Sequence, residues 1–218
     1  MNPLDTAIKF FQDCGLFIYP SLTIMAIGLA IAIERVIFLG RARSENRRLW
    51  EQVLPLLQGG RFKEVHGVAA ASDAAIGKIV ANGLTRMQSA RRREDIDAAM
   101  EEGMMEIVPR LEKRTHYIAT FANVITLVGL LGTIIGLIKG FTAVAAVDPA
   151  QKAALLSHSI SIAMNNTAFA LSVAIPFLLI HAFLQARTSE IVDGLEAAKI
   201  SFLNLVQRVK ADSAATTR

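Results

Sequence analysis

Cysteine and charge are scarce in this 218-residue chain. Cys14 is the only cysteine, so the sequence excludes an intrachain disulfide and a zinc site built on several cysteines. Charged residues make up 19% of the chain and hydrophobic residues 53%, with a mean hydropathy of +0.42, which is unusual for a water-soluble domain. The composition therefore predicts a membrane protein.

The motifs that mark common enzymes are also missing. The sequence contains no phosphate-binding loop, no GxSxG, no HExxH and no histidine close to Cys14. His158 and His181 would lie about 35 Å apart on one helix, too far apart to share a metal ion. We expect neither an enzyme nor a bound metal or cofactor.

Three long uncharged runs concentrate the hydrophobic residues. Each is long enough to cross a bilayer core of about 30 Å once as a helix, which rises about 1.5 Å per residue. The runs are Cys14 to Ile33, Tyr117 to Ile138 and Ala153 to Ala186. The sequence therefore predicts three transmembrane helices.

Basic residues gather at one end of each run. Such clusters remain on the cytoplasmic side of a membrane, which explains the pI of about 9.5 without a nucleic-acid partner. The flanking residues are Arg35, Arg41, Arg43, Arg47, Arg48, Arg110, Lys113, Arg114 and Arg187. We expect the N-terminus outside, and the middle segment and C-terminus in the cytoplasm.

The predicted fold is an all-α membrane protein with a helical cytoplasmic insert and a helical tail. The expected parts are a periplasmic N-terminus over 1–13, spans over 14–39, 116–146 and 156–186, a cytoplasmic domain over 40–115, a periplasmic loop over 147–155 and a C-terminal helix and tail over 187–218. Within the insert, Gly59 and Gly60 predict a break. An acidic helix from Arg93 is expected to continue past a kink at Pro109 into the second span.

Small and polar residues form a stripe along the second span. At 100° per residue they fall within about 80° on one side. The stripe consists of Thr126, Gly129, Thr133, Gly136 and Gly140, and Gly132 adds overlapping GxxxG spacings. This pattern is typical of close helix packing and also suits the wall of a water-filled path, and the sequence leaves both interpretations open.

The third span is polar on two sides. Asn165 lies on one face, and Asn166 and Thr167 lie on another. Hydrogen bonds between helices explain such amides, and contact with an aqueous path explains them as well. Neither the second nor the third span contains Asp or Glu, so a titrating carboxylate at mid-membrane would have to come from another chain.

Two segments carry a resemblance to a known family. LVGLLGTIIGL at 127–137, followed by Phe141, and NTAFALSVAIP at 166–176 resemble the signature segments of the MotA/TolQ/ExbB family of ion-driven motor subunits. The three spans, the helical insert and the helical tail are similar to the ExbB/TolQ branch over essentially the whole chain.

The resemblance implies a multi-pass protein of the bacterial inner membrane. It implies a pentamer whose second and third spans line a pore around a dimer of single-span partners of the ExbD/TolR/MotB type, which bring the ion-carrying Asp. Thr133 and Thr167 match family threonines that face this pore. A TonB-like or TolA-like periplasmic client, or an attachment to peptidoglycan, would receive the work, and the other contacts would be with membrane lipids.

The predicted site combines the resemblance with the two stripes. The ion-pathway candidates are Thr126, Thr133, Asn165, Asn166 and Thr167, and the packing candidates are Gly129, Gly132, Gly136 and Gly140.

The transported ion is left open. ExbB and TolQ proteins often carry a glutamate five residues before the third-span threonine, where this chain has Ile162. Neutral oxygens of Asn, Ser and Thr could coordinate sodium, so the sequence allows either protons or sodium. A passive membrane scaffold is the alternative function, whereas a small-solute transporter is disfavoured because no inverted repeat is apparent.

Overall fold

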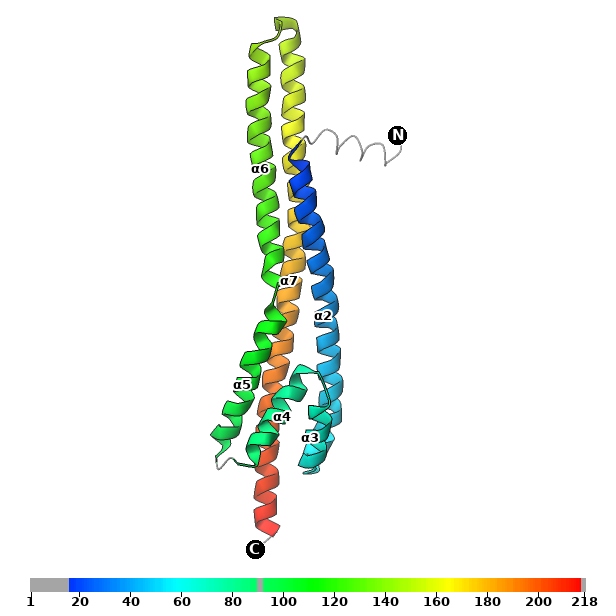
Figure 1. Ribbon diagram of the computed structural model, residues 1–218, viewed down its shortest axis with the longest axis vertical. Coiled ribbons are helices and arrows are strands. Elements are labelled where there is room, and N and C mark those ends of the chain that lie inside the picture. The colour runs from blue at the N-terminus through cyan, green and yellow to red at the C-terminus, as the bar shows by residue number, and fades with distance from the viewer. Residues whose placement is uncertain (1–15, 90–91, 217–218) are drawn as a thin grey trace. The chain divides into compact units, whose positions relative to one another are not determined.

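The computed structural model describes residues 16–89 and 92–216, with side chains up to 209, and all of its regular elements are helices. They are labelled in Figure 1: α2 (Ile18–Gln58), α3 (Phe62–Ala70), α4 (Ala75–Met87), α5 (Arg93–Glu112), α6 (Thr115–Ala145) and α7 (Pro149–Thr216). Of the described helices, α2, α6 and α7 contain segments long and apolar enough to cross a membrane. The predicted all-α architecture with three spans is confirmed. The predicted N-terminal segment 1–13 and Cys14 lie outside the described residues.

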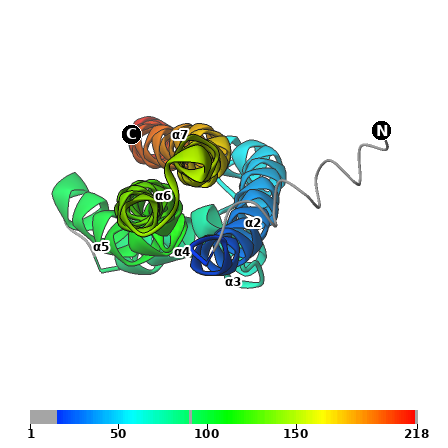
Figure 2. The same cartoon turned by 90° about the horizontal axis from the view of Figure 1, so that it is seen from above.

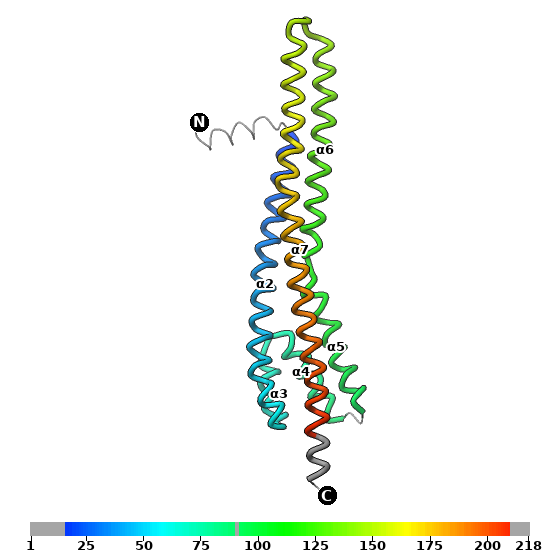
Figure 3. The backbone as a smooth tube through the Cα atoms, turned by 180° about the vertical axis from the view of Figure 1, so that it is seen from behind, coloured from blue at the N-terminus to red at the C-terminus, as the bar shows by residue number. Residues whose placement is uncertain are grey.

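The chain forms two compact units. One comprises Arg114–Phe183 with the described residues up to Glu34, and the other comprises Arg35–Lys113 with the chain from Leu184 onward. In the first unit, α6 and the beginning of α7 lie side by side as an antiparallel hairpin, which Figures 1 and 3 show from opposite sides and Figure 2 shows nearly end on. This hairpin carries every predicted site residue.

The hairpin connection is shorter than predicted. Helix α6 ends at Ala145 and α7 begins at Pro149, so most of the predicted loop 147–155 is helical. Proline is well suited to the first turn of a helix, because the amide hydrogen it lacks would have no helical partner there. Helix α7 then runs through Pro176 without interruption, so the third span and the predicted tail form one helix.

The second unit is a helical bundle with its own apolar core. Helix α4 packs against both α3 and α5. Buried residues recur at helical spacing along each element, as in Val53 and Leu57 of α2 or Met100 and Met104 of α5. The predicted break at Gly59 and Gly60 is confirmed, and Gly60 has a left-handed φ of 68° that favours glycine.

The junction between α5 and α6 differs from the sequence prediction. Helix α5 continues past Pro109 to Glu112, and Arg114 then adopts a left-handed φ of 68° before α6 begins at Thr115. The predicted continuous helix was therefore wrong. The buried Arg35 explains the stop, because its guanidinium donates to the Leu111 carbonyl at 2.8 Å and a cation stabilises the end of a helix.

A half-buried lysine, Lys199, holds α5 to the C-terminal part of α7. The Lys199 ammonium lies 2.6 Å from Glu101 and 3.2 Å from Asp97, and its side chain is 14% exposed. The hydrogen bond to Glu101 is the largest cause that raises the Lys199 pKa above its ordinary value of 10.5. The charged Lys199 therefore stabilises the folded protein at pH values below that ordinary pKa. This contribution is lost as the pH rises through the higher pKa of the folded state.

We expect Lys199→Met to lower the free energy of unfolding by about 1 kcal/mol, because two carboxylates would lose their shared partner. Chemical denaturation at pH 7 measures this change. The control is Lys63→Met, which removes an exposed lysine on α3. Equal stability of the two variants would show that the Lys199 cluster contributes nothing.

Candidate functional site: a threonine pair between α6 and α7

Small residues set the register between α6 and α7. A Cβ atom added to Gly140 would lie 2.5 Å from the Ser159 Cβ, one added to Gly136 would lie 3.2 Å from the Ala163 Cβ, and one added to Gly129 would lie 2.3 Å from the Ala170 Cβ. Going from Gly140 to Gly136 and on to Gly129 takes steps of four and seven residues along α6. The facing residues of α7 are separated by the same steps in the opposite direction. Real Cβ atoms do not approach within 3.0 Å of one another, so Gly129 and Gly140 permit a backbone approach that alanine would prevent.

The predicted threonines meet within this close contact. The hydroxyls of Thr133 on α6 and Thr167 on α7 hydrogen-bond to each other. The Thr133 hydroxyl also lies 3.0 Å from the Ala163 carbonyl and 3.1 Å from the Gly129 carbonyl, and the Thr167 hydroxyl lies 3.4 Å from the Gly129 carbonyl. Two residues 34 positions apart in the sequence therefore form one hydroxyl pair between two spans.

The pair has spare capacity to accept hydrogen bonds. Each hydroxyl carries one proton and two lone pairs. If Thr133 donates to the Ala163 carbonyl, Thr167 can donate to Thr133, and both oxygens still keep a lone pair. Both side chains are half-buried, so the free lone pairs can reach a group outside the hairpin. Such oxygens can accept from a water or a protonated carboxyl group, or coordinate a cation.

The remaining polar candidates have different surroundings. The Thr126 hydroxyl donates to the Ala122 carbonyl of its own helix at 2.9 Å. Asn166 is 5% exposed, and its amide nitrogen would lie 2.7 Å from a Cβ added to Gly132, so it faces α6. Asn165 is half-buried. The structure thus brings Asn166 to the helix contact beside Thr167, and an ion-pathway role for all three residues stays a prediction.

Sequence reasoning missed two features of the packing in this unit. The Ala163 carbonyl accepts from Thr133, and a backbone oxygen gives no signal in a sequence. Gly28 of α2 is the other, and it belongs to a separate close contact, because a Cβ added there would lie 2.3 Å from the Phe177 ring and 3.3 Å from that of Phe121. Its isolation within a long apolar run was the available signal. All of these residues belong to the first unit, so the part of α2 before Arg35 packs closely on the hairpin.

The hydroxyl pair has no titrating neighbour among the described residues of α6 and α7 at this level of the helices. Lys139 and His158 lie nearer the turn that joins the helices, and no group of three His, Cys, Asp or Glu side chains in the described chain could hold a metal ion. The pair can therefore hold a hydrogen bond or a cation but cannot store a proton itself, since aliphatic hydroxyls do not titrate near neutral pH.

Comparisons with known proteins identify the family. The model of the MotA/TolQ/ExbB proton channel family matches residues 71–197, which include both segments that form the threonine pair. A Methanothermobacter thermautotrophicus protein described as a biopolymer transport protein ExbB homolog is 23% identical over 201 residues, covering 91% of this chain and 70% of the relative.

A second relative agrees. The Synechocystis protein named biopolymer transport protein ExbB-like 3 is 28% identical over 166 residues, covering 76% of this chain and 78% of the relative. The family match extends over more than half of the sequence, and its residues form α4, α5, α6 and the part of α7 up to residue 197. The chain belongs to the MotA/TolQ/ExbB proton channel family.

Proposed function

We propose that this chain is the pore-forming subunit of an ion-driven motor in an inner membrane. The family is a channel and transport family whose members form complexes with partners of the ExbD/TolR/MotB type. The observation that carries the proposal is the Thr133–Thr167 hydroxyl pair, which lies between two spans that contain no carboxylate. The pair has accepting capacity for a proton-carrying group that another chain supplies.

The proposed complex is a pentamer of this chain around a dimer of single-span partners, each with one Asp in its span. One elementary charge that crosses a potential of 100 mV releases about 2.3 kcal/mol. An apolar wall with a few hydroxyls favours the neutral form of the partner Asp and makes its charged form costly. The carboxylate would thus be protonated on the wall and ionised where it meets water. This would couple ion flow to rotation of the pentamer around the partner dimer.

Orientation and client are part of the proposal. The basic flanks support a periplasmic N-terminus and a cytoplasmic insert and C-terminus. The client is a periplasmic or envelope component attached to the partner, of the TonB or TolA type or peptidoglycan itself. We propose protons as the transported ion. Sodium is the alternative. It is supported by Ile162, which stands where ExbB and TolQ proteins often have a glutamate, and by the neutral oxygens of the wall, which could coordinate the ion.

A passive scaffold is the second candidate, and the glycine contacts support it as well as they support a channel. Gly129, Gly132 and Gly140 show that α6 and α7 are built for close packing, which a scaffold would need as much as a channel. The two functions differ in ion flux, because a scaffold conducts no ions with any partner.

Purification of the tagged chain from its native membrane, followed by reconstitution into liposomes, tests the proposal. We expect mass spectrometry to find a single-span partner with an intramembrane Asp at five copies of this chain to two of the partner. Dyes for pH and for sodium inside the liposomes should report flux of one ion when a potential is applied. The control is this chain reconstituted alone, which should conduct neither ion. Absence of flux with the partner present would favour the scaffold.

A further inference from the structure

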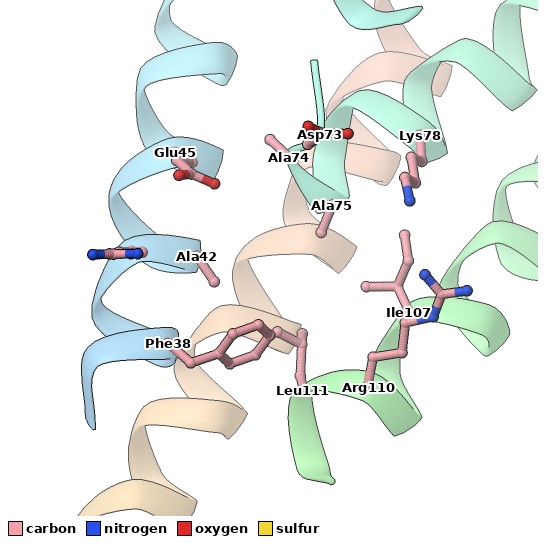
Figure 4. Close-up of a pocket in the computed structure, with 11 residues that line it drawn as sticks. Phe38, Ala42, Glu45, Asp73, Ala74, Ala75, Lys78, Ile107, Arg110 and Leu111 are labelled. Atoms are coloured by element: carbon pink, nitrogen blue, oxygen red, sulfur yellow. The ribbon is translucent and has the colours of Figure 1, made fainter. Parts of the chain in front are cut away.

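A pocket of about 370 Å³ lies in the second unit between α2, α4 and α5 (Figure 4). Its floor is apolar: Ile107 and Leu111 of α5 are 6% and 3% exposed, and Phe38 and Ala42 come from α2. The Arg35 guanidinium lies over the Phe38 ring, 4.5 Å from its centre, which is within the range of a cation–π interaction. The rim consists of exposed charged side chains, so the pocket combines an apolar floor with a polar opening.

The rim carries five charged side chains, namely Arg41, Glu45, Asp73, Lys78 and Arg110. Figure 4 shows Lys78 of α4 and Arg110 of α5 pointing toward each other on one side, Glu45 of α2 on the opposite side, and Asp73 between Glu45 and Lys78. Arg110 donates to Glu106 at 2.6 Å, but a guanidinium has five donors and keeps several for a further acceptor. Two converging cations with free donors suit a phosphate, and the two carboxylates suit an ammonium group.

The pocket also lies near the expected membrane surface. Helix α2 is continuous from Ile18 to Gln58, and Phe38 lies in the last turn of the expected span 14–39. The headgroup layer on each side of a bilayer core is about 5–7 Å thick. The floor at Phe38 therefore begins where acyl chains end, and on α2 the rim residues Arg41 and Glu45 follow about 3 Å and 9 Å beyond the end of that span.

We propose that this pocket binds a membrane phospholipid whose headgroup carries a phosphate and a primary ammonium, as phosphatidylethanolamine does. The phosphate lies between Lys78 and Arg110, the ammonium lies at Glu45 and Asp73, and the beginning of an acyl chain covers Phe38 and Leu111. The lipid would join α2, α4 and α5 at the membrane surface. The proposal needs only the membrane location of α2 and does not depend on ion conduction.

Lipid binding to the delipidated full-length oligomer, measured by native mass spectrometry, tests this site. The probes are phosphatidylethanolamine, phosphatidylglycerol with the same acyl chains, and soluble O-phosphoethanolamine. Replacing Lys78 and Arg110 by Met should weaken binding of both lipids by about fivefold for each cation removed. Glu45→Gln with Asp73→Asn should weaken binding of phosphatidylethanolamine but not that of phosphatidylglycerol, which has no ammonium group and is itself an anion.

The matched control replaces two exposed cations outside the pocket, Lys63→Met with Arg208→Met, and should bind both lipids as the unmodified chain does. Circular dichroism and the oligomer mass verify that each variant folds and assembles. Unchanged phosphatidylethanolamine binding after loss of Lys78 and Arg110 would overturn the site. Tighter binding of phosphatidylglycerol than of phosphatidylethanolamine would overturn the ammonium contact, and equal affinity for O-phosphoethanolamine would identify a soluble phosphate compound as the occupant.

Discussion

Thr133→Val and Thr167→Val should each lower partner-dependent ion flux by about tenfold to a hundredfold while the oligomer remains assembled. Valine keeps the shape of threonine and removes its hydroxyl, so the wall loses one partner for the carboxyl group that crosses it. A hydrogen bond to a charged or proton-sharing group contributes about 1.5–3 kcal/mol, which corresponds to that range of rates. Flux into liposomes that contain the chain and its partner measures the effect.

Assembly should survive because the lost contact between helices is a small part of the packing. Polar bonds between membrane helices contribute about 0.6 kcal/mol on average. The carbonyls that accept from Thr133 and Thr167 belong to continuous helices, which also provide backbone donors. The oligomer mass and the thermal unfolding midpoint should therefore stay close to those of the unmodified chain.

Two controls make the result specific to the hydroxyl pair. Thr133→Ser removes the methyl group and keeps the hydroxyl, so this variant should keep most of the flux. Thr142→Val removes a hydroxyl on the same helix that donates to Ile138 within its own turn, and should have no effect. Normal flux in both Thr133→Val and Thr167→Val would contradict the placement of the ion pathway at this pair.

Local pattern was enough to predict most helices but not their junctions. The runs of apolar residues predicted the three spans, and Gly59 and Gly60 predicted the break after α2. The end of α5 could not be predicted, because it depends on Arg35, which lies far away in the sequence and reaches the Leu111 carbonyl. Pro109 was the stronger local signal, and it predicted only a kink. The contact between Arg35 and the Leu111 carbonyl places the end of α5 after Pro109.

The site was predictable as a set of residues but not as a geometry. Helical periodicity placed Thr133 on the small-residue side of its span, and the family resemblance selected Thr167. Their meeting depends on the antiparallel register of α6 and α7, which the short turn before Pro149 and the glycine contacts determine together. No local pattern in either span encodes that register, so the shared hydroxyl contact and the role of the Ala163 carbonyl appear only in the structure.

Gly129→Ala should destabilise the protein by about 1–3 kcal/mol, although alanine is normally the better helix former. The added Cβ would lie 2.3 Å from the Ala170 Cβ, so α6 and α7 must move apart and the Thr133–Thr167 contact must lengthen. Gly136→Ala should cost less, because its Cβ would lie 3.2 Å from Ala163. Thermal unfolding in detergent, followed by circular dichroism, measures the order of the two effects.

The sign of the change is the informative part of this experiment. At Gly40 and Gly194 an added Cβ meets nothing within 4 Å, so alanine there should stabilise the helix by about 0.5–1 kcal/mol through the lower entropy of the unfolded chain. Gly129→Ala combined with Ala170→Gly returns the lost space and should recover most of the stability, which a double-mutant cycle quantifies. If Gly129→Ala stabilised the protein as Gly40→Ala does, the register that joins the two threonines would be wrong, and the proposed ion pathway would lose its structural basis.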